Sequence, residues 1–274
     1  KGRAYKIGSD WNLYEFIQDK VVNEKWSPAA VAGYIDRCGL KFSVRICAAT
    51  IYNYIHHGLF EKIREKDLVK YRKRKGKGFK RVALKNIKGR SIEERPDISG
   101  RDSFGHWEMD TVVGKQGSKP CLLVLTERLT RFEIIRKIPD KKQSSVIRQL
   151  NGIERKIGAD AFRKNFRTIT MDNGVEFLDQ KAIESSVLEK KEKRTEAYYC
   201  HPFASWERGS NENLNKMIRR WIPKGADISE YTREYAGKIN RWMNDYPRKI
   251  FDYLSSRDIL ESCCADADAL LSLT

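Results

Sequence analysis

The spacing of apolar residues predicts three short helices at the start of the chain. The first is capped by Asp10, and its apolar side consists of Leu13, Phe16, Ile17 and Val21. The second begins at Ser27, with Pro28 in its first turn, and ends at Gly39, while the third covers about residues 48–57. Two helices separated by a short connection indicate a helix-turn-helix, although any small helical bundle gives the same pattern.

After residue 105 the pattern becomes that of strands. The segments HWEMDTVV, CLLVLTE and RFEIIRKI predict a three-stranded antiparallel meander, with His106, Glu108 and Asp110 on one face of its first strand. A helix over about 142–157, the strand RTITMD, a helix over about 181–188, the strand EAYYC and a long helix ending before Pro223 follow. This α/β order, β-β-β-α-β-α-β-α, is that of an RNase H-like fold, although other α/β arrangements can produce it.

Charge is concentrated between these two regions. The chain carries 54 Lys and Arg against 37 Asp and Glu, a formal net charge of +17, which is typical of a protein that binds a polyanion. Twelve basic residues and one acidic residue fall between Lys66 and Arg90, in a run with little periodicity. The run fits a solvated tether or a strap that follows DNA. In the second case the residues expected to contact phosphates are Arg72, Lys73, Arg74 and Lys75.

These features divide the chain into four predicted parts. They are a helix-turn-helix domain at 1–65, a basic linker at 66–104, an RNase H-like core at 105–223 and a helical extension at 224–274. Hydrophobic residues make up 40% of the 274 residues, which is enough for a core and excludes wholesale disorder. The first residue is Lys rather than Met, which suggests a piece of a longer protein.

Several other classes of protein are disfavoured. No stretch of eighteen apolar residues and no signal peptide occurs, so we expect a cytoplasmic protein without a membrane partner. Six cysteines without a C-x-x-C pair argue against a zinc knuckle, and the length argues against a disulfide scaffold.

Three carboxylates stand where an α/β sheet would build a site. Asp110 lies within the first predicted strand and Asp172 at the C-terminal end of the fourth, while Glu212 lies on the last helix opposite its apolar stripe. Converging carboxylates repel one another unless a cation lies between them, and oxygen ligands without His or Cys suit Mg²⁺. We therefore expect two Mg²⁺ ions, replaceable by Mn²⁺, although each acid taken alone is more often a surface or capping residue.

A second glutamate competes for the third ligand position. Glu176 is only four positions after Asp172 and follows Asn173 and Gly174, which are expected to let the chain turn sharply. The chain is leaving the strand end there, so Glu176 can equally cap or flank the next helix. We therefore favour Glu212 as the third ligand.

The residues expected to contact DNA outside the linker are Tyr52, Asn53, His201, Trp206 and Arg219. Arg219 is seven positions after Glu212, hence on the same side of the helix, where its guanidinium can hold a phosphate. His201 precedes Pro202 and could orient water or phosphate, and Trp206 could stack on a base. The ordinary alternatives are a surface position for Arg219 and loop packing for His201 and Trp206.

Four segments carry a family resemblance: HWEMDTVVG, TMDNGVEF, CHPFASWERGSNENLNKMIRRWIPKG and MNDYPRKIFDY. In this order, from about residue 105 to 260, they closely resemble bacterial insertion-sequence transposases of the DDE type, specifically the family named for insertion sequence thirty. The upstream WSPAAVAGYI and ATIYNYI are similar to that family's helix-turn-helix. The resemblance implies an RNase H-like catalytic domain with Asp110, Asp172 and Glu212 as metal ligands.

The activity implied is metal-dependent cleavage at the ends of an insertion sequence, followed by transfer of the freed 3′-hydroxyl into DNA. Asp110 would bridge the two ions, double-stranded DNA would be the partner, and a homodimer or larger assembly would form on it in the bacterial nucleoid. A catalytically inactive DNA-binding regulator and a nuclease without strand transfer are the alternatives.

The chain departs from the family pattern in two respects. The resemblance implies a further N-terminal helix-turn-helix segment, usual in the family, which we expect to have no counterpart in these 274 residues. The interval from Asp172 to Glu212 is 40 positions, a few more than is common, and Glu189–Arg194 is the expected extra length.

Overall fold

The computed structural model describes residues 5–68, 89–96, 100, 102–201, 207 and 209–274, except for the side chains of 66 and 209–212. The chain forms two compact units. As far as these ranges are described, the first comprises Lys1–Lys80 and Asp245–Ser256, and the second Arg81–Asn244 and Arg257–Thr274. Within the described ranges, no helix has the length and apolar composition needed to cross a membrane.

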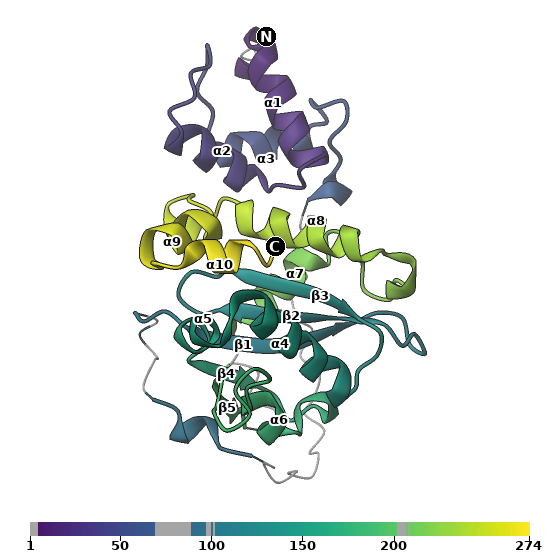
Figure 1. Cartoon of the computed structure of the whole chain (residues 1–274). Helices are drawn as coiled ribbons and strands as arrows, with labels where there is room; N and C mark the ends of the chain where they lie inside the picture. Colours follow the sequence, from purple (N-terminus) through teal and green to yellow (C-terminus); the bar gives the residue numbers. More distant parts are fainter. Residues whose placement is uncertain (1–4, 69–88, 97–99, 101, 202–206, 208) are drawn as a thin grey trace. The chain divides into compact units, whose positions relative to one another are not determined.

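The first unit is built from helices (Figure 1). They are α1 (Trp11–Val22), α2 (Pro28–Arg37) and α3 (Ala48–His56), with 3₁₀ turns at Lys6–Ser9, Glu65–Asp67 and Lys249–Phe251. The predicted caps are confirmed: Asp10 Oδ1 accepts from the Leu13 amide at 2.9 Å, and Ser27 Oγ accepts from the Ala30 amide at 3.1 Å. Both helices therefore start where the local sequence predicts.

One feature of this unit was predicted and another was not. Residues 38–47 connect α2 to α3, close to the predicted helix ends, and this link is longer than the three or four residues of a tight helix-turn-helix. The segment 245–256 returns from far along the chain, and the Tyr246 hydroxyl accepts from the Ser27 amide at 3.1 Å. Gly33 of α2 allows this close approach, because a Cβ there would lie 2.2 Å from the Tyr253 ring.

The second unit contains a five-stranded sheet. Its strands are β1 (His106–Val113), β2 (Cys121–Glu127), β3 (Glu133–Ile138), β4 (Thr168–Met171) and β5 (Glu196–Tyr199). Their order is β3-β2-β1-β4-β5, with β1, β2 and β3 antiparallel and β4 and β5 parallel to β1. The predicted meander is confirmed, and this mixed α/β sheet is consistent with an RNase H-like core.

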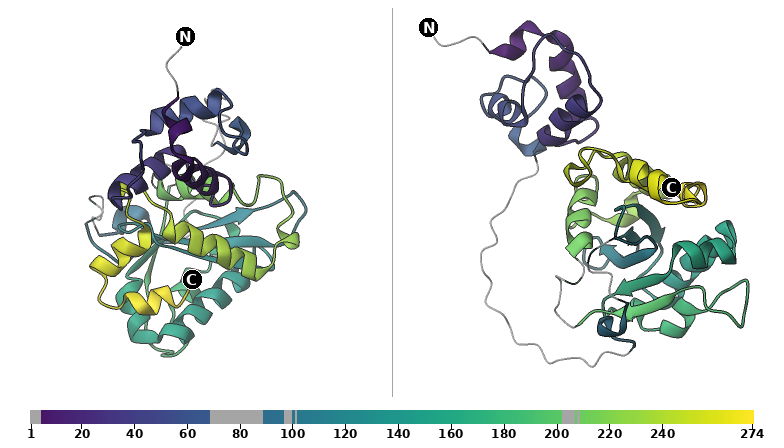
Figure 2. Two further views of the ribbon diagram at one scale, coloured as in Figure 1. Left: turned by 90° about the horizontal axis from the view of Figure 1, so that it is seen from above. Right: turned by 90° about the vertical axis from the view of Figure 1, so that its left-hand side faces the viewer.

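Helices surround the sheet. They are α4 (Gln143–Ile157), α5 (Ala159–Asn165), α6 (Gln180–Glu184), α7 (Gly209–Ile218), α8 (Arg233–Asp245), α9 (Ser256–Cys263) and α10 (Ala267–Leu271), with 3₁₀ turns η3 (Ile92–Glu94), η4 (Val175–Phe177) and η6 (Ile228–Glu230). Helices α4, α5 and α6 lie on one side of the sheet and α7 on the other (Figure 2).

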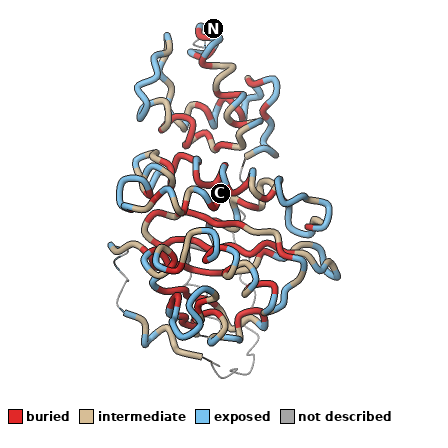
Figure 3. Tube along the Cα trace, in the orientation of Figure 1, coloured by how far each residue is buried: buried red, intermediate tan, exposed pale blue. Residues whose placement is uncertain are grey.

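The main core lies between the sheet and α4. Trp107 and Met109 of β1 face Val146 and Leu150 of α4, and all four are fully buried. Buried residues run along the strands (Figure 3). Leu260 and other apolar residues of α9 and α10 join the same cluster, although these helices lie in the range predicted as an extension. The opposite face of β1 is thereby left to its polar residues, including Asp110.

Both edges of the sheet are covered. At the β3 edge, Asn240 and Asn244 of α8 accept from the amides of Ile135 and Glu133 at 2.8 Å, and both donate to the Glu133 carbonyl. These bonds satisfy backbone groups that an exposed edge strand would offer to another chain.

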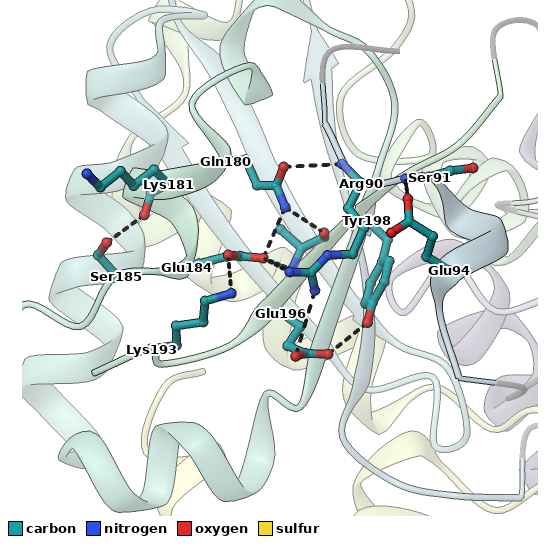
Figure 4. A network of polar contacts seen from close by, with 11 residues as sticks. Arg90, Ser91, Glu94, Gln180, Lys181, Glu184, Ser185, Lys193, Glu196 and Tyr198 are labelled. Carbon is teal, nitrogen blue, oxygen red and sulfur yellow. Dashed lines mark hydrogen bonds and ion pairs between the residues drawn. The ribbon is translucent and has the colours of Figure 1, made fainter. Parts of the chain in front are cut away.

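At the β5 edge, the residues that follow the undescribed basic run lie against β5, where the Arg90 side chain reaches Glu184 and Glu196 (Figure 4). The Arg90 carbonyl accepts from the Tyr199 amide at 2.9 Å, and its guanidinium lies 3.7 Å from Glu184 and from Glu196. The end of the predicted linker is thus attached to the sheet.

One predicted helix end was wrong. The helix expected to reach residue 188 ends at Glu184, and the Glu184 carbonyl accepts from the Arg194 amide, which closes a short loop. The last predicted helix ends before Pro223, as expected, with Ile218 as its final residue. After this end, Trp221 donates its amide to the Ile218 carbonyl in a tight turn.

Candidate active site

The site is built at the C-terminal end of β4 beside the middle of β1. The parallel register pairs His106 with Thr168 and Glu108 with Thr170, and the same register continued by two residues would pair Asp110 with Asp172. Neighbouring strands lie about 4.8 Å apart, so two carboxylates on one face in this register are neighbours. Both aspartates are partly exposed, as a site that receives a substrate requires.

Helix α7, from a later part of the chain, also contacts Asp110. Asn215 Nδ2 donates to Asp110 Oδ2 at 2.9 Å, while Asp110 Oδ1 accepts from the Thr111 amide at 2.8 Å. Both oxygens of Asp110 are therefore oriented by the protein. Glu212 lies on α7 one turn before Asn215, but its side chain is outside the described residues. Positions three apart share a helix face, so α7 brings position 212 to the Asp110 side of the sheet.

Arg219 follows the end of α7 and is half-buried. Its Nη2 donates to the carbonyl oxygen of Val113 at 2.7 Å, and burial lowers the pKa of its guanidinium. This bond attaches the turn after α7 to the end of β1.

Gly174 leaves space for two carboxylates. Its φ is −61°, a value that any residue can adopt, so a positive φ is not the reason for a glycine here. Instead, a Cβ at this position would lie 2.6 Å from Glu176 Oε2 and 2.9 Å from Asp172 Oδ1. Glu176 is buried, and its Oε1 accepts from the Thr111 hydroxyl at 2.7 Å and lies 3.2 Å from Lys141 Nζ. Glu176 therefore faces the Asp172 loop rather than capping the next helix.

His201 lies between two carboxylates. Its Nδ1 is 2.7 Å from Glu207 Oε1 and its Nε2 is 3.3 Å from Glu93 Oε1. The Glu207 carboxylate, with a smaller contribution from Glu93, raises the pKa of His201. The Glu207 carboxylate also accepts from the His201 amide at 2.9 Å, so these residues join both sides of the loop that leads to α7.

The polar face of the sheet continues away from Asp110 as a buried network. Arg95 Nη1 donates to Thr170 Oγ1 at 2.8 Å, and His106 Nδ1 lies 2.8 Å from Thr168 Oγ1. Burial, reinforced by nearby arginines, lowers the pKa of His106 to about 4. His106 is therefore neutral near pH 7 and serves as a hydrogen-bonding group rather than as a cation.

The remaining predicted residues lie elsewhere. Tyr52 and Asn53 are exposed on α3 of the first unit. Trp206 and the linker residues Arg72, Lys73, Arg74 and Lys75 lie outside the described residues.

The carboxylates at this site can be compared with the ligands that a divalent metal ion requires. Among the described side chains, no group of three or more His, Cys, Asp or Glu has the geometry of a metal site. The described part contributes the carboxylates of Asp110 and Asp172, and the third predicted ligand, Glu212, is not among the side chains described. Adjacent carboxylates without His or Cys fit a hard divalent cation such as Mg²⁺.

Sequence reasoning did not identify every residue that shapes this site. Asn215 lies one turn after Glu212 in the motif GSNENLNK, and this spacing could have marked it as a residue of the site. Nothing in the local sequence indicates that its side chain reaches Asp110. Lys141, Glu93 and Glu207 could not be found, because their partners are distant or belong to other elements.

No protein-family model matches the chain. Over 249 residues it is 36% identical to the transposase for insertion sequence element IS4351 of Bacteroides fragilis, a match covering 87% of this chain and 70% of that protein. Over 214 residues it is 36% identical to a probable transposase for insertion-like sequence element IS1161 of Streptococcus salivarius, covering 77% and 58%. Over 254 residues it is 29% identical to transposase InsI for insertion sequence element IS30C of Escherichia coli (strain K12), covering 89% and 63%. The chain thus spans between 58% and 70% of the length of these relatives.

Proposed function

Because the chain belongs to the family of bacterial insertion-sequence transposases, which includes those of IS30, we propose that it is a DNA transposase. It cleaves a phosphodiester at the end of an insertion sequence and joins the freed 3′-hydroxyl to a second DNA. The observation that carries the proposal is the convergence on Asp110: Asp172 directly follows β4, the strand that pairs with β1, and Asn215 of α7 donates to Asp110 one turn after Glu212.

The protein's part in the reaction is to hold the cations and to orient the carboxylates that bind them. Asp110, Asp172 and Glu212 would bind the cations, and the Asn215 amide keeps Asp110 Oδ2 in position. Two Mg²⁺ ions, when bound, would stabilise charge on the attacking and leaving oxygens of an in-line displacement. In the first step water attacks phosphorus and the 3′-oxygen leaves as a hydroxyl. In the second that hydroxyl attacks a target phosphodiester, so one P–O bond forms as one breaks.

DNA binding is assigned to the first unit and the linker. Tyr52 and Asn53 lie on the exposed side of α3, and we assign them to base contacts by a helix-turn-helix. The linker lysines and arginines are assigned to phosphates, which add affinity without sequence readout. Arg219 and His201 are assigned to positioning DNA near the site, and Trp206 to stacking on a base. The active form is a homodimer or larger assembly on DNA in the bacterial cytoplasm.

The test is a gel assay with the full chain. The substrate is a duplex that carries the terminal repeat of the element that encodes the chain and continues into flanking DNA, labelled at the 5′ end of the strand to be cleaved and mixed with supercoiled plasmid and saturating Mg²⁺. A transposase yields a shortened strand and labelled plasmid. Cleavage alone would instead identify a nuclease, and a shifted band without cleavage would identify a DNA-binding regulator.

Glu212→Gln keeps the side-chain shape and removes the charge, so it should abolish cleavage while DNA affinity stays nearly intact. Glu230→Gln, the same change at an exposed position of the same unit, is the matched control and should cleave normally. DNA binding should persist in Ca²⁺ without cleavage, because Ca²⁺ does not impose octahedral geometry. Efficient cleavage by Glu212→Gln, or by the unaltered chain in EDTA, would reject the metal mechanism.

A further inference from the structure

Glu176 is a buried carboxylate that the proposed reaction leaves without a role. It lies on η4, directly after the Asp172 loop, and is only 2% exposed. One of its oxygens, Oε1, is held by the Thr111 hydroxyl at 2.7 Å and by Lys141 Nζ at 3.2 Å. Thr111 adjoins Asp110 along β1, so this carboxylate is fixed against both aspartate-bearing segments.

The other oxygen of Glu176 has no such partner. Oε2 is buried, and no hydrogen bond reaches it from the described residues. A buried carboxylate oxygen without a hydrogen bond is costly, because it loses its water without replacement. Such an atom indicates a partner that belongs to the working state of the protein.

The position of Oε2 identifies where that partner lies. Glu176 Oε2 and Asp172 Oδ1 are 2.6 Å and 2.9 Å from the same point, the site of a Cβ on Gly174, so the two oxygens are at most 5.5 Å apart. Asp172 Oδ1 also accepts from the Gly174 amide at 2.9 Å, which fixes its side of the gap. Asp172 Oδ1 therefore has a donor, and of the two oxygens it is Glu176 Oε2 that still requires a positively polarised group beside it.

We propose that Glu176 Oε2 accepts a hydrogen bond from a water molecule of the divalent cation held by Asp172. Glu176 is then a positioning residue of the cation site rather than a direct ligand. The inference rests on the proposed function, which places a cation at Asp172. Mg²⁺ dehydrates reluctantly and keeps several waters in protein sites, so a carboxylate reached through water suits it. Thr111 and Lys141 aim the carboxylate, and Gly174 leaves the space.

The test measures cation binding directly, without DNA or turnover. Free Mn²⁺ is followed by electron paramagnetic resonance while Mn²⁺ is titrated into the full chain. Glu176→Gln puts an amide in place of the carboxylate and removes the charge, so it should weaken Mn²⁺ binding about 10-fold, as the loss of groups behind metal ligands commonly does. Asp172→Asn should remove binding at this site, and Glu230→Gln should bind like the unaltered chain.

A second variant separates the position of the oxygens from their charge. Gly174→Ala adds one methyl group where the two oxygens lie, at a φ that alanine tolerates, and should also weaken Mn²⁺ binding about 10-fold. Circular dichroism and melting temperature check that each variant is folded. In cleavage, Glu176→Gln should need about 10-fold more Mg²⁺ for half-maximal rate and still cleave at saturation.

The outcomes are distinct. The role of Glu176 would be overturned if Glu176→Gln and Gly174→Ala both bound Mn²⁺ with affinities within twofold of the unaltered chain while Asp172→Asn failed to bind it. That result would leave the proposed function standing. Complete loss of binding in Glu176→Gln, equal to that of Asp172→Asn, would make Glu176 a direct ligand and also overturn the proposal. Unchanged binding in Asp172→Asn would instead remove the cation from Asp172, and with it the metal mechanism.

Discussion

Arg194→Met is expected to destabilise the sheet-containing unit strongly. The Arg194 side chain is fully buried, and it donates to the carbonyls of Ile183 and Ala182 at 2.8 and 3.0 Å and to Asn151 Oδ1 at 2.7 Å. Its Nη1 also lies 3.2 Å from Oε2 of Glu154, which is equally buried. Methionine occupies a similar volume but leaves the Glu154 charge in the core without its counter-ion.

The magnitude follows from this burial. Removing one partner of a fully buried ion pair costs about 3–5 kcal/mol, against a total stability of about 5–15 kcal/mol for a typical domain. Removing both charges is far less costly, so adding Glu154→Leu to Arg194→Met should restore about 2 kcal/mol or more. The Val187 amide, which donates to Glu154 at 2.9 Å, loses its acceptor in the double variant, which limits the recovery.

Native-state hydrogen exchange measured by mass spectrometry provides the assay, because it reports the free energy of opening for each unit separately. Peptides from the central strands β1 and β2 report on this unit. Arg155→Met, on the exposed side of α4, is the control and should change the opening free energy by less than about 0.5 kcal/mol. A loss below about 1 kcal/mol in Arg194→Met, or a double variant no more stable than the single one, would refute the reasoning.

Three further predictions concern other parts of the chain. Gly152 lies within α4 with open space where a Cβ would lie, so Gly152→Ala should stabilise this unit by about 0.5–1 kcal/mol, measured by the same exchange. Replacing Arg72, Lys73, Arg74 and Lys75 with Ala should weaken binding to all duplexes alike and flatten the log–log salt dependence by about 0.9 for each phosphate no longer neutralised; an unchanged slope would make the run a tether. Glu207 raises the pKa of His201 above its ordinary value near 6.5, so the stabilisation is complete below that pH and is lost as pH rises through the raised pKa. NMR titration should show a lower pKa of His201 in Glu207→Gln. An unchanged pKa would exclude an interaction between the His201 ring and the Glu207 carboxylate.

Local pattern was sufficient to predict most of the secondary structure. β1 and β2 have the predicted bounds, because alternating or continuous apolar residues bounded by turn residues leave little choice of strand limits. The starts at Asp10 and Ser27 were predictable for a similar reason, since an N-cap acts on an amide only three residues away. The neighbouring position of Asp110 and Asp172 was also accessible, because their places on adjacent parallel strands set the register once the sheet order is known.

Tertiary structure decided which side chains complete the site. Thr111 meets Glu176 across 65 positions and Asn215 meets Asp110 across 105, and neither pair leaves a periodic signal in the sequence. The return of segment 245–256 to the N-terminal helices and the attachment of α8 to the β3 edge are likewise long-range contacts. Spacing along the chain reports the shape of one element, because its periodicity comes from that element's own geometry. Which charged group lies against which depends on how separate elements pack, so the contacts of Asp110 with Asn215 and of Glu176 with Thr111 follow only from the folded sheet.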